Sequence, residues 1–71
     1  MNGYAVIIEG DGESFSGYAP DLPGCVAAGS SPSEVEELMR DAIRLHIESL
    51  RAHGEAVPPP SAAAATVVDV A

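Results

Sequence analysis

Cysteine is nearly absent from this sequence of 71 residues, in which Cys25 is the only one. A single cysteine excludes an internal disulfide. The two histidines have no close ligand spacing to it, so we expect neither a structural metal nor another cofactor. A chain this short buries only about 60% of its unfolded surface and is marginally stable alone. We therefore expect stabilisation by association, as a homodimer or higher homo-oligomer.

Positive charge is also scarce. Three arginines and no lysine stand against eleven acidic residues, giving a net charge of −8. Binding to a phosphate backbone needs clustered cations, so we expect no direct contact with nucleic acid. An acidic balance suits a basic partner, although solubility alone explains many acidic proteins. No apolar run approaches about 18 residues and no basic N-terminal region precedes one, so we expect no membrane association and a cytoplasmic location.

Proline and glycine are concentrated in residues 18–25, Tyr-Ala-Pro-Asp-Leu-Pro-Gly-Cys. Pro20 and Pro23, followed by Gly24, are incompatible with a helix interior or a central strand. Each proline also pushes the residue before it toward extended geometry. The segment is predicted to be a rigid corner between two strands. We assign structural roles to Pro20, Pro23 and Gly24, and to Cys25 as a small buried thiol.

Three short strands are predicted around this corner. Residues 4–9 are apolar at nearly every position, which indicates a central strand covered on both faces. The glycine- and acid-rich residues 10–13 predict a hairpin turn, and 14–19 alternate in character as the returning strand does. Residues 25–28 form the third apolar run.

One amphipathic helix is predicted after the strands. Ser31 fits the N-cap, Pro32 the first turn, and Glu34 completes a capping box. The apolar arc runs to about His53, where Gly54 supplies the C-terminal stop. His46 lies near the middle of this arc, and a lone histidine there is more often packed in a core than catalytic. We therefore give His46 a structural role.

The C-terminal residues predict a spacer and a last strand. Three consecutive prolines stiffen residues 58–65, and the β-branched residues 66–70 read as a strand. The whole chain, 1–71, is then a single α+β domain of order β-β-β-α-β. We expect a mainly antiparallel sheet of spatial order 3-2-1-4 with the helix on one face. Whether the last strand pairs in its own chain or with a neighbouring subunit stays open, as does the oligomer size.

Four acidic residues are the candidates for partner binding: Glu9, Asp11, Glu13 and Asp21. They lie in or next to predicted loops, where recognition often occurs. Ordinary turn chemistry is the competing interpretation, since aspartate is a turn former.

Glu9, Glu48 and Asp69 invite comparison with a two-metal nuclease site, but Glu48 lies on the polar face of the helix and should not converge with the others. We predict no catalytic residues, no metal site and no enzyme activity.

Several of these segments together resemble the HicB-like antitoxin family. The resemblance rests on residues 4–9, the acidic turn, residues 17–25, the capped helix with Leu45-His46-Ile47-Glu48, and residues 54–58. The Pro-Asp-Leu-Pro-Gly-Cys segment is its most specific part. The resemblance implies a truncated ribonuclease-H-like fold and a place in a type II toxin–antitoxin pair.

In such pairs the antitoxin binds and masks a small, basic, mRNA-cleaving HicA-like toxin. Many members also carry a C-terminal DNA-binding module, for which these 71 residues leave no room, so we do not expect operator binding. The alternative is a solitary homo-oligomeric domain with a regulatory or structural role and no toxin partner. Whether a cognate toxin exists, and whether a longer chain carries the missing module, stay open.

Overall fold

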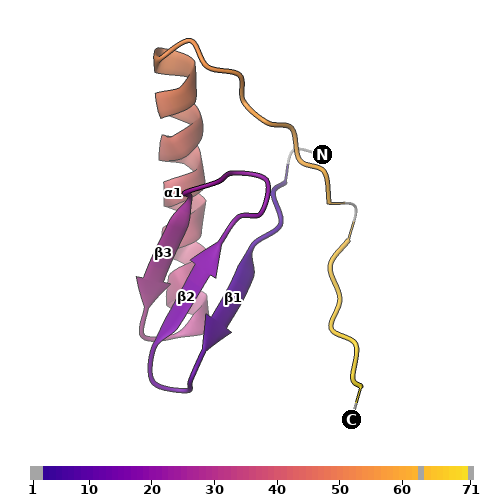
Figure 1. Ribbon diagram of the computed structural model, residues 1–71. Helices are drawn as coiled ribbons and strands as arrows, with labels where there is room; N and C mark the ends of the chain where they lie inside the picture. Colours follow the sequence, from indigo (N-terminus) through magenta and orange to yellow (C-terminus); the bar gives the residue numbers. More distant parts are fainter. Residues whose placement is uncertain (1–2, 63, 71) are drawn as a thin grey trace.

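The computed structural model describes residues 3–62 and 64–70, and its elements form two layers. Three strands come first, β1 (Ile7–Gly10), β2 (Phe15–Tyr18) and β3 (Val26–Gly29). One helix, α1 (Pro32–Ala52), follows and covers one face of the sheet (Figure 1). The α+β class and the order of these four elements agree with the prediction.

The sheet is an antiparallel meander in the order β1-β2-β3. Its register places Ile7 opposite Tyr18, which in turn lies opposite Val26. Gly17 faces the helix, because a Cβ added there would lie 2.7 Å from Val35 Cγ1 and 3.2 Å from Met39 Cγ. A side chain at this position would push the helix away from the sheet, so glycine permits their close approach.

The predicted fourth strand is absent from the described residues. Residues 64–70 have no strand conformation, so the spatial order 3-2-1-4 is wrong in its last member. The run 4–9 was therefore wrongly interpreted as a central strand: β1 is an edge strand, with Ile8 and Glu9 exposed. Residue 63, in the predicted spacer 58–65, lies outside the described residues.

The proline corner supplies most of the core. The buried apolar side chains are Ala19, Leu22, Cys25, Val35 and Met39. The first three come from the corner, and Leu22, held between two prolines, is fully inaccessible to solvent. Ala19 N–H donates to Cys25 O at 3.2 Å, and Leu22 N–H and Cys25 N–H donate to Ala19 O and Leu22 O, both at 3.0 Å. These three backbone hydrogen bonds close the corner and hold Leu22 in the core.

Both ends of α1 form where the sequence predicts them. Glu34 N–H donates to Ser31 Oγ at 3.2 Å, as an N-cap requires. The Glu34 carboxylate differs from a standard capping box, because it accepts from Ser30 N–H at 2.7 Å rather than from the N-cap itself. Gly54, at φ 69°, ends the helix, with Glu55 N–H donating to Leu50 O at 2.8 Å. This is a Schellman motif.

The helix buries a narrower face than its sequence predicts. Val35 and Met39 are buried, and Ala42, Ile43 and Ile47 pack against the core. Leu38 and Leu45, expected on the same apolar arc, are 41% and 58% exposed. Three strands of four residues each make a sheet too small to cover the whole arc.

Leu22→Ala tests the central place of the corner. Removing a fully buried leucine leaves a cavity, so we expect a loss of about 2–5 kcal/mol in the free energy of unfolding. The matched control is Leu45→Ala, which removes the same atoms from an exposed position and should cost less than about 0.5 kcal/mol. Urea unfolding followed by circular dichroism measures both. Equal losses of unfolding free energy in the two variants would contradict the central place of Leu22 in the core.

Candidate protein-binding surfaces

One candidate surface is the side of the sheet that faces away from α1, here called the outer face. Because side chains alternate along a strand, Ser16 and Tyr18 point away from the helix when Gly17 points toward it. The register extends this face to both neighbouring strands. The outer face consists of Ile7, Glu9, Ser16, Tyr18, Val26 and Ala28.

An apolar row crosses one end of the outer face. Ile7, Tyr18 and Val26 are direct neighbours in the register. Tyr18 is 41% exposed and Val26 is 65% exposed, while Ile7 is half-buried. An apolar row left open beside polar residues is typical of a surface that meets another protein.

The acidic turn lies at the other end of the same strands. Asp11 Oδ1 accepts hydrogen bonds from Glu13 N–H and Ser14 N–H, both at 2.9 Å. These bonds, that from Ser14 first, lower the pKa of Asp11 from its ordinary value. Glu9, Asp11 and Glu13 are all exposed. Asp11 therefore stabilises the turn through its side chain, which is the alternative to partner binding. Its charge still faces solvent.

Asp21 does not join the other three candidate acids. It lies in the corner at the opposite end of β2, where its carboxylate binds the segment after the helix. Ser61 N–H donates to Asp21 Oδ2 at 2.9 Å, and the Ser61 hydroxyl donates to Asp21 Oδ1. These two bonds lower the pKa of Asp21, the side-chain bond being the larger cause. Asp21 thus fastens residues 55–62, here called the linker, to the corner.

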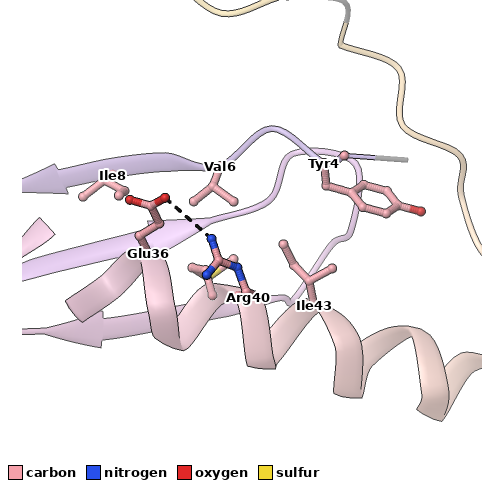
Figure 2. A pocket seen from close by; sticks show the side chains of 8 residues that line it. Tyr4, Val6, Ile8, Glu36, Arg40 and Ile43 are labelled. Carbon is pink, nitrogen blue, oxygen red and sulfur yellow. Dashed lines mark ion pairs between the residues drawn. The ribbon is translucent and has the colours of Figure 1, made fainter. Parts of the chain in front are cut away.

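A second candidate surface is a groove between β1 and α1. Figure 2 shows Tyr4, Val6 and Ile8 on one wall and Ile43 on the other, with the Glu36–Arg40 ion pair between them. The cavity measures about 610 Å³, and Met39 and Gly3 complete its lining. The ion pair is long, 3.9 Å, and both side chains are mostly exposed. The prediction missed this groove because it placed a fourth strand along β1.

The remaining candidate residues have structural surroundings. Cys25 is buried, and burial raises the pKa of its thiol. His46 is half-buried on α1 and is not among the buried core residues. Within residues 3–62 and 64–70, no three His, Cys, Asp or Glu side chains converge as a metal site requires. In the same part of the chain, no helix has both the length and the apolar character needed to cross a membrane.

Comparison with known proteins identifies the family. Residues 4–70 match the family described as "HicB_like antitoxin of bacterial toxin-antitoxin system". The chain belongs to this family. The match covers the three strands, the corner, the helix and the residues after it, and so confirms the resemblance carried by the corner motif. The partial ribonuclease-H-like fold implied by that resemblance is not tested by it.

Two curated proteins are similar to the chain. The chain is 38% identical over 65 residues to "UPF0150 protein Ta0767" from Thermoplasma acidophilum, spanning 90% of this chain and 94% of that one. It is 34% identical over 55 residues to an "Uncharacterized 14.9 kDa protein in rep-hol intergenic region" of Haemophilus phage HP1. That match spans 78% of this chain and 41% of the phage protein. No solved structure shows significant similarity.

Asp21→Ala tests the fastening of the linker. Without its two acceptor oxygens, we expect the Ser61 amide hydrogen to exchange with solvent at nearly the rate of an unstructured amide. Asp41→Ala is the control, because Asp41 is an exposed aspartate on α1 that pairs with Arg44 at 3.4 Å. It should leave Ser61 unchanged. NMR measures the exchange rate of the Ser61 amide in both variants. Similar rates would show that Asp21 does not hold the linker.

The same contact predicts a pH dependence. A carboxyl whose pKa is lowered in the folded state contributes stability above its ordinary pKa, here 3.8, and loses it as the pH falls through the lower folded value. The Ser61 amide resonance should therefore titrate with a midpoint below 3.8. A midpoint at or above that value would be incompatible with the two hydrogen bonds.

Proposed function

We propose that this HicB-like protein is an antitoxin that binds a small, basic, mRNA-cleaving HicA-like toxin through its outer face. The observation that carries the proposal is the combination of an exposed apolar row on this face with the acidic turn (Glu9, Asp11 and Glu13) at the other end of the same strands. The row, Ile7, Tyr18 and Val26, supplies area that gains from leaving water. Glu9, Asp11 and Glu13 supply charge opposite to that of a basic partner.

The distribution of charge supports binding on this side of the molecule. All three arginines, Arg40, Arg44 and Arg51, lie on α1, which covers the opposite face of the sheet. Glu9 on the outer face and the acids of the adjoining turn therefore have no arginine beside them on the same face. A surface of one sign raises the rate at which an oppositely charged partner associates.

Occlusion is the mechanism that these residues fit. A protein that cleaves RNA must attract a phosphate backbone, which requires exposed cations around its active site. Carboxylates presented on a turn can occupy the same cations and so compete with phosphate. The apolar row then buries adjacent surface and excludes water from the contact. This mechanism requires no catalytic group on the antitoxin.

The first test is co-expression with the neighbouring small basic reading frame. We expect a folded complex and relief of growth inhibition. Tyr18→Ala should weaken binding at least about tenfold, because exposed aromatic residues near the centre of an interface carry much of its energy. Leu38→Ala, which changes an equally exposed residue on α1, should have little effect. No complex, or equal effects of the two variants, would refute binding through the outer face.

The acidic turn has a separate test. Glu9→Gln combined with Glu13→Gln should slow association with the toxin, and the remaining rate should depend less on salt. The control is Glu37→Gln combined with Glu48→Gln, which removes the same charge from exposed positions on α1. Stopped-flow association at several ionic strengths compares them. Equal rates would show that net charge, not the acidic turn, governs encounter.

A second candidate function is a solitary homo-oligomeric domain without a toxin. The observation that favours it is the Thermoplasma relative, of which the match spans 94%, so that relative has little length beyond the matched region for a further domain. The co-expression experiment separates the two functions. A stable homo-oligomer that ignores every neighbouring basic protein would favour the second.

A further inference from the structure

The groove between β1 and α1 is open along an unpaired strand edge. Among the described residues, β1 pairs with β2 alone, so its other edge presents backbone donors and acceptors without strand partners. Tyr4, Val6 and Ile8 lie along this edge and face Ile43 of the helix (Figure 2), and Met39 also lines the groove. A bare edge above an apolar groove is suited to an added β-strand.

The chain contains an apolar segment that lacks cover. Val67, Val68 and Val70 are 96%, 72% and 88% exposed in the stretch of residues 64–70, here called the tail. In Figure 1 the tail descends on the β1 side of the sheet, in the same general direction as β1. Such β-branched side chains favour a strand and are costly to leave in water. The tail and the groove are therefore complementary in chemistry and in strand propensity.

The exposed area shows that the tail and the groove together leave enough surface uncovered for a stable interface. The chain exposes 5263 Å², whereas a compact monomer of its mass, 7.2 kDa, exposes about 4,100 Å². The excess of about 1,100 Å² exceeds the roughly 800 Å² that each partner buries in a standard interface. Filling the groove and covering the tail would account for an excess of this size.

The linker is fastened to the domain at two points. Asp21 holds Ser61, and the Tyr4 hydroxyl donates to Pro58 O, so the linker is fastened beside the start of β1. Pro58, Pro59 and Pro60 stiffen it further. From there the tail leaves its own domain with its valines exposed, although its length would allow it to return. Stiff, restrained hinges of this kind favour exchange between copies.

We propose that two copies of this chain exchange their tails, each tail adding a parallel strand to β1 of the other copy. Residues 62–70 span about 30 Å when extended, enough to follow the roughly 23 Å of residues 4–10. Val68 and Val70 share one side of such a strand and enter the groove. Val67 and Asp69 then lie on the outer face, beside β1 of the other copy. The exchange is reciprocal and closes as a twofold dimer.

Sedimentation of the purified chain without toxin tests the dimer. We expect a dimer for the native sequence, and a folded monomer for Val68→Asp, because the new charge would be buried in the groove. Val26→Asp is the matched control, an equally drastic change at a valine of similar exposure on the outer face, and it should leave the dimer intact. A monomeric native protein, or a dimer unaffected by Val68→Asp, would overturn the proposal.

A disulfide trap identifies which chain fills the groove. Val6→Cys and Val68→Cys are combined with Cys25→Ala and oxidised at low protein concentration. Exchange predicts a covalent dimer on a non-reducing gel, whereas a tail returning to its own groove gives a cross-linked monomer and refutes exchange. If Cys25→Ala does not fold, the same pair is made with Cys25 retained, since that thiol is buried. Neither readout depends on toxin binding, so failure here leaves the proposed antitoxin function untouched.

Discussion

The burial of Leu22 in the core is the interaction on which the rest of this small fold depends. A loop normally runs over the surface, but here the corner supplies Ala19, Leu22 and Cys25 to a core that the helix completes with Val35 and Met39. Three short strands alone cannot bury enough apolar area to be stable. The corner therefore adds core side chains to the sheet and the helix, and its rigidity favours this burial because little chain entropy is lost there.

The local signals of the sequence predicted most of the elements. Helix boundaries follow from residues that satisfy backbone groups nearby, so Ser31, Pro32 and Gly54 located both ends of α1 to within one residue. The corner was predicted as a rigid turn with Cys25 buried, but the burial of Ala19 and Leu22 was not predicted, because proline and glycine specify backbone direction and say nothing about depth. The width of the helix face was overestimated at Leu38 and Leu45, since periodicity does not show how much sheet is available to cover it.

The candidate surfaces were only partly accessible to sequence reasoning. Glu9, Asp11 and Glu13 cluster because they are neighbours along one hairpin, which the turn signal already indicated. Asp21 is separated from them by the length of β2, and its contact with Ser61 joins residues forty positions apart. No local pattern indicates such a contact. The groove along β1 is open because, among the described residues, no fourth strand pairs with β1, which is a property of tertiary arrangement.

The error over residues 4–9 is itself informative. A run apolar on both sides is typical of a strand covered on both faces and flanked by neighbours, yet β1 in the single chain is an exposed edge. The apolar pattern of residues 4–9 is the one expected of a strand that is buried on both faces. In the single chain only the face toward α1 is covered. An added strand along the β1 edge and a toxin on the outer face would together restore the environment that the pattern describes. The two proposals thus cover different sides of one strand, and neither requires the other.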